Sequence, residues 1–187
     1  MRKDASDAQS AAFLSVLAET MRQKRIIVIT GKGKGKTTSA VGTIIRALGY
    51  RRKVVVIKFF KKTPSGEDKI LRSLGVRVYL FGTKNFFNPK KMPQDLKKEI
   101  QKGWQRAQKL GNKVDLLVLD EINLVLAGNL LPKEEVKNFI QKSQAHLIFT
   151  GRCAPLWLIR FADTVSRINE VKHIFQKGGR AEKGIEL

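Results

Sequence analysis

The chain alternates between short apolar runs and segments in which apolar residues recur at helical spacing. The apolar runs, which predict strands, are residues 26–29, 54–60, 76–81, 114–119 and 146–150. The helical segments between them are residues 36–48, 67–74, 94–110 and a helix that begins within 131–135, where a proline precedes two acids. Strands and helices are therefore expected to follow one another along most of the chain.

Strands that are apolar on both faces and separated by helices are typical of a parallel sheet covered on both sides. We therefore predict an α/β fold, doubly wound around a mostly parallel sheet, in a single domain of residues 25–187. The basic stretch 82–93 is too irregular for a strand, and the tail 169–187 is rich in glycine and lysine. Neither of these two stretches is assigned an element.

Residues 1–24 differ from the rest because they are polar and rich in alanine. Ala11, Leu14, Ala18 and Met21 recur at helical spacing and would share one face of a helix. The segment is interpreted as an N-terminal amphipathic helical arm. A frayed tail is an equally good interpretation of a terminal segment of this length.

Composition changes this picture mainly through charge. The 187 residues include 37 Lys and Arg against 16 Asp and Glu, a formal net charge of +21, with a pI near 10.4. Such an excess indicates anionic partners such as nucleotides, nucleic acid or acidic lipid. A single cysteine, Cys153, excludes an internal disulfide framework, and no window is apolar enough for a membrane helix. Because the N-terminus lacks a secretory pattern, we expect a cytoplasmic protein with no membrane partner.

The strongest motif is a glycine-rich loop between the first strand and the first helix. It consists of Thr30 followed by Gly31, Lys32, Gly33, Lys34, Gly35, Lys36, Thr37 and Thr38. Glycines let backbone N–H groups curl around phosphate oxygens, and the helix that follows presents its positive end to the same anion. Lys36 is predicted to reach the phosphates and Thr37 to hold Mg²⁺. The first glycine of the usual phosphate-loop pattern would fall on Thr30, so it has slipped to Gly31.

A second motif supports the first. Asp120 and Glu121 end the apolar run 114–119, as in a Walker B strand whose tip faces the phosphate loop. One of the two carboxylates can organise Mg²⁺ directly or through water. Two acids that merely cap the next element are the structural alternative.

Other candidate residues follow less specific patterns. Arg152 comes just after the run 146–150, at the edge where open α/β sheets bind ligands, and its guanidinium suits phosphate. Phe86 and Phe87 lie among lysines, where they would stack on a flat ring system or pack beneath a loop. Cys153 is predicted to be a small buried hydrophobe rather than a pocket thiol, and no catalytic role is assigned to it.

A set of short motifs, in order from about Arg25 to Leu187, resembles the P-loop type of cob(I)alamin (corrinoid) adenosyltransferase. The motifs are 31–38, Ser65-Gly66-Glu67, Asp120-Glu121-Ile122, Leu131-Pro132 with Glu134-Glu135-Val136, Thr150-Gly151-Arg152, 162–166, Val171-Lys172-His173 and 183–186. The slipped glycine, the TGR segment and the tail motifs in succession make this combination specific.

The resemblance implies a P-loop NTPase fold of the RecA-like type. It also implies an enzyme that transfers the 5′-deoxyadenosyl group of ATP to the Co(I) of a reduced corrinoid, releasing triphosphate, in adenosylcobalamin biosynthesis or salvage. Residues 31–38 would bind the triphosphate, with Lys36, Thr37 and Glu121 as the catalytic set. Arg46 falls where the family has an arginine associated with nucleotide binding.

The resemblance further implies Mg²⁺ at Thr37 and Glu121, beside Asp120 of the Walker B motif, and usually a homodimer. The N-terminal arm would fold over the corrinoid, with a reductase or flavoprotein as the supplier of Co(I). Departures lie in the corrinoid region, where relatives often have Phe and Trp at Asn85 and Phe87, and in the loop, where Lys32 replaces a common Asn.

Two other classes of P-loop protein remain as alternatives. A nucleic-acid-dependent ATPase is favoured by the net charge and by phenylalanines among lysines, and Glu121 would then activate water. A small-molecule kinase is a third reading, although no lid segment with paired arginines is evident. Under the adenosyltransferase reading, only non-specific nucleic-acid binding is expected.

Overall fold

The structure, a computed structural model, describes residues 23–83 and 93–185. The proposed N-terminal arm, Phe86 and Phe87 lie outside these residues. The strands are β1 (Ile26–Thr30), β2 (Val54–Phe59), β3 (Arg77–Phe81), β4 (Leu116–Asp120), β5 (His146–Thr150) and β6 (Thr164–Arg167). They form one sheet in the order β3-β2-β4-β5-β1-β6, and every strand pairing in it is parallel.

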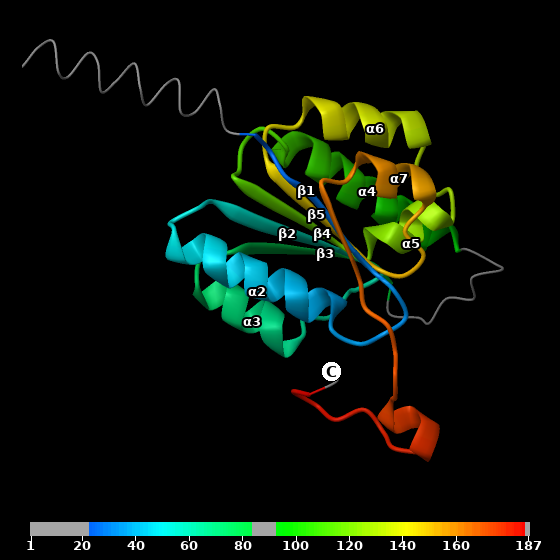
Figure 1. Cartoon of the computed structure of the whole chain (residues 1–187). Coiled ribbons are helices and arrows are strands. Elements are labelled where there is room, and N and C mark those ends of the chain that lie inside the picture. Colours follow the sequence, from blue (N-terminus) through cyan, green and yellow to red (C-terminus); the bar gives the residue numbers. More distant parts are fainter. Residues whose placement is uncertain (1–22, 84–92, 186–187) are drawn as a thin grey trace, which may run out of the picture.

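Helices cover both faces of the sheet, as Figure 1 shows. On one face lie α2 (Lys36–Gly49) and α3 (Gly66–Ser73), and on the other α4 (Gln94–Leu110), α5 (Ile122–Ala127), α6 (Lys133–Lys142) and α7 (Leu156–Phe161). Each strand connects to the next strand along the chain through at least one helix, and β4 connects to β5 through two, α5 and α6. This confirms the predicted α/β fold with a parallel, doubly wound sheet.

The two faces of the sheet bury two separate hydrophobic cores because neighbouring residues of a strand point to opposite sides. In β2, Val54 and Val56 belong to the core beneath α2 and α3, with Ile44 and Leu71 from those helices. Residues 55, 57 and 59 of the same strand belong to the larger core under the other helices, which includes the fully buried Trp104. The alternation explains why the sequence of β2 reads as a continuous apolar run.

Four short elements of the described residues were not predicted from the sequence. β6 pairs with β1 at the edge of the sheet, and all four of its residues are exposed, so no apolar run marks it. The helices α5 and α7 have six residues each, which is too short for helical spacing to emerge. In the tail, the structure forms only a short 3₁₀ helix, η1 (Ile174–Lys177).

Gly103 in α4 illustrates how closely this helix packs on the sheet. A Cβ at this position would lie 2.8 Å from Cε1 of Phe59 and 3.0 Å from Cδ2 of Phe81. The residue must therefore be small. Gly42 in α2 is different, because a Cβ there would have no neighbour within 4 Å.

Replacing each of the two glycines by alanine is expected to change the free energy of unfolding in opposite directions. Alanine gains about 1 kcal/mol over glycine in a helix interior, whereas overpacking a core costs about 1–3 kcal/mol. We expect Gly103→Ala to lower the free energy of unfolding by about 1 kcal/mol and Gly42→Ala to raise it by a similar amount. Urea unfolding followed by circular dichroism checks both, and stabilisation by both substitutions would contradict the packing described for α4.

Candidate functional site

The glycine-rich loop lies at the carboxyl edge of the sheet, between β1 and α2, and packs against the chain that follows β6. Gly31 has a φ of +107°, and a Cβ on it would lie 2.2 Å from the carbonyl oxygen of Ile168. The N–H of Gly33 donates to that same oxygen at 2.9 Å, and the N–H of Ile168 donates to the Thr30 carbonyl at 2.8 Å. Gly31 is thus required both by its backbone conformation and by the approach of Ile168. Thr30, which stands where the usual pattern has glycine, is the last residue of β1.

Lys36 opens α2 and is almost fully buried. Its Nζ donates to the Gly33 carbonyl at 2.7 Å, so the lysine spans the loop that precedes it. Burial lowers the pKa of Lys36, while the negative charge of Glu121 opposes that shift. The lysine is therefore positioned among charges of both signs, close to the first turn of α2.

Asp120 ends β4 and is held by two threonines from different elements. Its Oδ1 accepts a hydrogen bond from Oγ1 of Thr37 in α2 at 3.0 Å and from Oγ1 of Thr150 in β5 at 2.5 Å. The Thr150 hydroxyl also accepts a hydrogen bond from the Glu121 N–H at 3.0 Å. The predicted proximity of the strand tip and the phosphate loop is confirmed by these bonds.

Glu121 adopts a left-handed conformation with φ of +60° directly after β4. Such a conformation is costly for a residue with a side chain, and it is found most often at functional sites. Within the described residues, Oε2 of Glu121 is buried without a hydrogen-bond partner. Burial raises the pKa of Glu121, and the charge of Asp120 raises it further, against the opposing effects of Lys36 and Arg152.

The oxygen atoms of Thr37, Asp120 and Glu121 suit a hard divalent cation. The unpartnered Glu121 oxygen is the observation that favours a cation here, because a buried carboxylate oxygen is normally satisfied. Within residues 23–83 and 93–185, no group of three His, Cys, Asp or Glu side chains converges as a metal site. Mg²⁺ sites typically have few protein ligands and are completed by water and phosphate.

Lys58 is a charged neighbour of this site that sequence reasoning missed. It lies in β2 beside Asp120 of β4, and it is only 1% exposed. Its Nζ lies 2.6 Å from Oδ1 of Asp68, 2.7 Å from Oε1 of Glu67 and 3.9 Å from Oδ2 of Asp120. One lysine within an otherwise apolar strand was the signal that could have identified it.

Asn123 in α5 was also missed and holds two strand ends together. Its fully buried Nδ2 donates to the carbonyl of Gly151 at 2.9 Å and to that of Ile29 at 3.3 Å. The ends of β1 and β5 are thereby fixed beside Glu121. The residue follows the acidic motif by only two positions, which is the signal that sequence analysis could have used.

An open cavity of about 900 Å³ adjoins the glycine-rich loop. It is lined by Thr30, Gly31, Lys32, Arg152, Cys153, Ala154, Arg167, Asn169 and Glu170. Arg152 is exposed at the edge where it was predicted, beside the loop. The prediction that Cys153 is buried is wrong, because the residue follows Gly151 in a left-handed turn with φ of +57° and is exposed.

Arg46 is not brought to the loop within this chain. It lies exposed in the last turn of α2, ten residues after Lys36, which corresponds to about 15 Å along the helix. Its role in nucleotide binding stays a prediction from the resemblance. In the part of the chain that the structure describes, no helix is long and apolar enough to cross a membrane.

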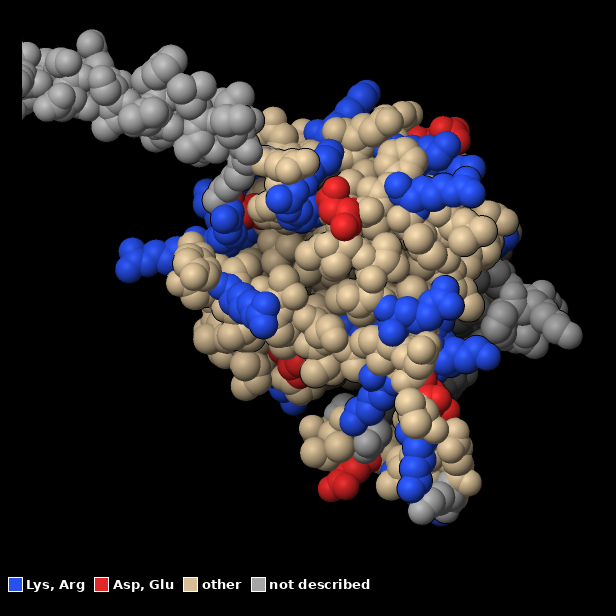
Figure 2. Space-filling view, viewed as in Figure 1, with Lys and Arg blue, Asp and Glu red and all other residues tan. Residues whose placement is uncertain are grey.

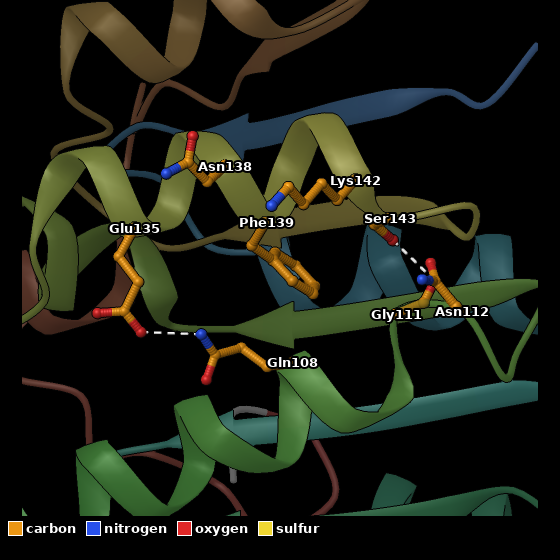
Figure 3. A pocket seen from close by; sticks show the side chains of 8 residues that line it. All are labelled: Gln108, Gly111, Asn112, Glu135, Asn138, Phe139, Lys142 and Ser143. Atoms are coloured by element: carbon orange, nitrogen blue, oxygen red, sulfur yellow. Dashed lines mark hydrogen bonds between the residues drawn. The ribbon is translucent and has the colours of Figure 1, made fainter.

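A separate cavity of about 330 Å³ lies between α4 and α6, toward the amino edge of the sheet. Figure 3 shows Glu135 and Gln108 facing one another across it, joined by a hydrogen bond of 2.8 Å. The same Glu135 oxygen accepts a bond from the Trp104 indole at 2.7 Å. These polar groups are satisfied by one another and contact none of the phosphate-loop residues, so the cavity is not part of the candidate site.

Comparison with known proteins gives a consistent picture. A family model described as "ATP:corrinoid adenosyltransferase BtuR/CobO/CobP" matches residues 22–187. The corrinoid adenosyltransferase of Escherichia coli K12 is 37% identical over 166 residues, which cover 86% of this chain and 84% of that protein. The corrinoid adenosyltransferase CobA of Salmonella typhimurium has the same identity and coverage.

A third relative extends the similarity farther along the chain. The corrinoid adenosyltransferase of Pseudomonas aeruginosa is 35% identical over 185 residues, or 92% of this chain and 91% of that protein. The glycine-rich loop, the Asp120–Glu121 pair and the TGR segment all lie within the matched residues. The chain belongs to the ATP:corrinoid adenosyltransferase BtuR/CobO/CobP family.

Proposed function

We propose that this protein transfers the 5′-deoxyadenosyl group of ATP to the Co(I) of a reduced corrinoid, with release of triphosphate, in adenosylcobalamin biosynthesis or salvage. Family membership over residues 22–187 supports the activity. The single structural observation that carries the proposal is the convergence of Lys36, Thr37, Asp120 and Glu121 at one sheet edge.

The triphosphate is proposed to lie in the loop of residues 31–38. Backbone N–H groups of this loop and the amino end of α2 favour an anion. Lys36 now donates to the Gly33 carbonyl, and a phosphate oxygen would take over this bond when ATP binds. The ammonium group of Lys36 would then stabilise the negative charge that develops on the departing triphosphate.

Mg²⁺ is proposed to bind beside the loop, with Thr37, Asp120 and Glu121 as its protein contacts. The bonds to Thr37 and Thr150 orient Asp120 before any cation arrives. Bound Mg²⁺ would neutralise part of the triphosphate charge and make it a better leaving group. The protein's part is to keep the oxygens of these side chains in place.

The proposed reaction needs no nucleophilic side chain, because Co(I) is itself a strong nucleophile. The protein has to align the cobalt with the 5′ carbon and exclude water. His146 is not available as a base at this edge, since its Nδ1 accepts the Arg25 N–H at 3.0 Å at the start of β5. The absence of a nucleophile from the predicted catalytic set therefore fits the chemistry.

The corrinoid is proposed to contact Phe86, Phe87 and the N-terminal arm, with Arg152 toward the nucleotide. All three lie outside the described residues; the position of Phe86 and Phe87 among lysines supports the role of these two, and the resemblance supports that of the arm. A homodimer is proposed from the resemblance, and a cytoplasmic location and a reductase or flavoprotein that supplies Co(I) are proposed with it. On the face that Figure 2 shows, the Lys and Arg side chains are scattered rather than gathered in one stripe, so this face does not favour a nucleic-acid groove.

Lys36→Ala tests the phosphate loop. We expect turnover at limiting ATP to fall by at least about a hundredfold, because a preorganised cation next to the leaving group is lost. The melting curve by circular dichroism should stay close to that of the wild type. Lys102→Ala, on the exposed face of α4 beside Glu99, is the matched control. Near-wild-type turnover of Lys36→Ala would contradict the assignment.

The products of ATP distinguish the adenosyltransferase from the ATPase alternative, because the two break different bonds. With Mg·ATP and chemically reduced cobalamin, phosphorus NMR should show intact triphosphate, formed only when the corrinoid is present. Added DNA or RNA should have no effect on the rate. ADP and orthophosphate formed without corrinoid and stimulated by nucleic acid would overturn the proposal.

The raised pKa of Glu121 predicts a pH dependence of cation binding. A protonated carboxyl cannot hold Mg²⁺, so Mg²⁺-dependent ATP binding should strengthen as the pH rises through the Glu121 pKa, which lies above the usual glutamate range. Glu121→Gln should bind more weakly and lose this pH dependence, whereas the surface variant Glu134→Gln should keep it. Calorimetric titrations with ATP from mildly acidic to neutral pH provide the measurement, and an unchanged profile in Glu121→Gln would refute the assignment.

A further inference from the structure

Lys58 occupies a position where a lysine is rarely found. Residues 54, 56 and 58 of β2 point to the sheet face covered by α2 and α3, and the first two are apolar core residues there. Residues 116, 118 and 120 of β4 form the neighbouring row, again with two apolar residues followed by a charge. Lys58 and Asp120 thus end two adjacent apolar rows, side by side in the parallel register.

The buried ammonium group is compensated by carboxylates on several sides. Asp68, which is fully buried, lies 2.6 Å from Nζ, and Glu67 lies at 2.7 Å. Burial alone would lower the pKa of Lys58, but hydrogen bonds with Asp68 and Glu67 raise it, so the lysine stays charged. For Glu67, hydrogen bonds from Lys58 and Ser65 overcome the effect of burial and lower the pKa to about 2. Hydrogen bonds from Lys58 and Ser65 likewise lower the pKa of Asp68, so Lys58, Glu67 and Asp68 are all ionised near neutral pH.

The charged cluster of Lys58, Glu67 and Asp68 is fixed at the start of α3. Asp68 accepts hydrogen bonds from the N–H of Ser65 at 2.9 Å and from its Oγ at 2.8 Å, which forms a capping box. This fixes Asp68 independently of the lysine. The ammonium group of Lys58 is consequently held against the fixed start of α3.

The contacts of Asp120 divide between its two oxygens. Oδ1 accepts bonds from Thr37 and Thr150, whereas Oδ2 faces the Lys58 ammonium at 3.9 Å. Contacts on both sides define the plane of the carboxylate. Rotation of this plane would separate Oδ1 from Thr37, the residue proposed to share the cation.

We propose that Lys58 is a positioning residue for Mg²⁺ and ATP. Its ammonium group is fixed by the carboxylates at the start of α3, and it in turn holds Asp120, beside the phosphate loop, in the orientation that the cation requires. The inference rests on the proposed function, because it assumes Mg²⁺ at Thr37 and Asp120. Residues that orient a metal ligand typically change metal affinity by about 10–100-fold when removed. No activity is assigned to Lys58 itself.

The direction in which the Mg²⁺ affinity changes distinguishes a positioning role of Lys58 from a purely electrostatic one. Lys58 is a cation near the proposed Mg²⁺ site, so a purely electrostatic role predicts tighter Mg²⁺ binding in Lys58→Met. Positioning predicts weaker binding. The single variant leaves Asp68 buried without its ammonium partner, which destabilises the fold. The double variant Lys58→Met/Asp68→Asn removes one charge of each sign and retains an oxygen for the Ser65 cap.

The experiment is a calorimetric titration of the purified full-length protein with ATP at a series of Mg²⁺ concentrations, with folding checked by circular dichroism. We expect the double variant to fold and to need about tenfold more Mg²⁺ for half-maximal enhancement of ATP affinity. ATP binding in the presence of EDTA should change little. The surface pair Lys137→Met/Glu134→Gln on α6 is the matched control and should behave as the wild type.

A double-mutant cycle tests whether Lys58 acts through Asp120. In an Asp120→Asn background, adding the Lys58→Met/Asp68→Asn change should produce no further loss of Mg²⁺ dependence. Additive losses would overturn the inference, as would a folded double variant with wild-type Mg²⁺ dependence or tighter Mg²⁺ binding in Lys58→Met. If the wild type itself binds ATP without any response to Mg²⁺, the proposed Mg²⁺ site fails, and the inference about Lys58 fails with it.

Discussion

The parallel register of β4 between β2 and β5 is the constraint on which the candidate site depends. Parallel strands bring their carboxyl ends to one edge, so residues distant in sequence meet there. Asp120 at the end of β4 has Lys58 beside it on β2 and Thr150 within hydrogen-bond distance on β5. A slip of one residue in β4 would turn Asp120 toward α4 and α5, away from Thr37. The geometry of the site is therefore a property of the sheet more than of any single loop.

Buried charges and backbone strain lie together at this same edge of the sheet. The residues of β2 and β4 that precede this edge are apolar, whereas here Lys58, Asp68 and Asp120 are buried together. Buried charges are retained only when they are paired and hydrogen-bonded. The left-handed Glu121, with its unpartnered oxygen, adds backbone strain at the same place. Unfavourable burial and strain in one location are typical of regions that serve binding rather than stability.

Most of the fold and the centre of the site could be predicted because their signals are local. Five strands were predicted because each is an apolar run, and the phosphate loop was recognised because its residues are contiguous. β6 lacks such a run, since its residues face solvent at the sheet edge. The role of Lys58 could not be derived from its own strand, because its partners come from α3 and β4. Cys153 was misjudged because local composition does not reveal that the turn after β5 faces outward.

The contact between the glycine-rich loop and Ile168 gives a reason for an otherwise unfavourable strand. A four-residue, fully exposed edge strand buries little and leaves backbone groups open to pairing with other chains. The residue that follows this strand, Ile168, however, packs against Gly31 and Gly33. The segment after β6 therefore supports the glycine-rich loop, and the loop gains this support only after Ile168 has left the ribosome. Nascent chains that lack residues beyond β5 would contain the complete glycine-rich motif but not the support that shapes it.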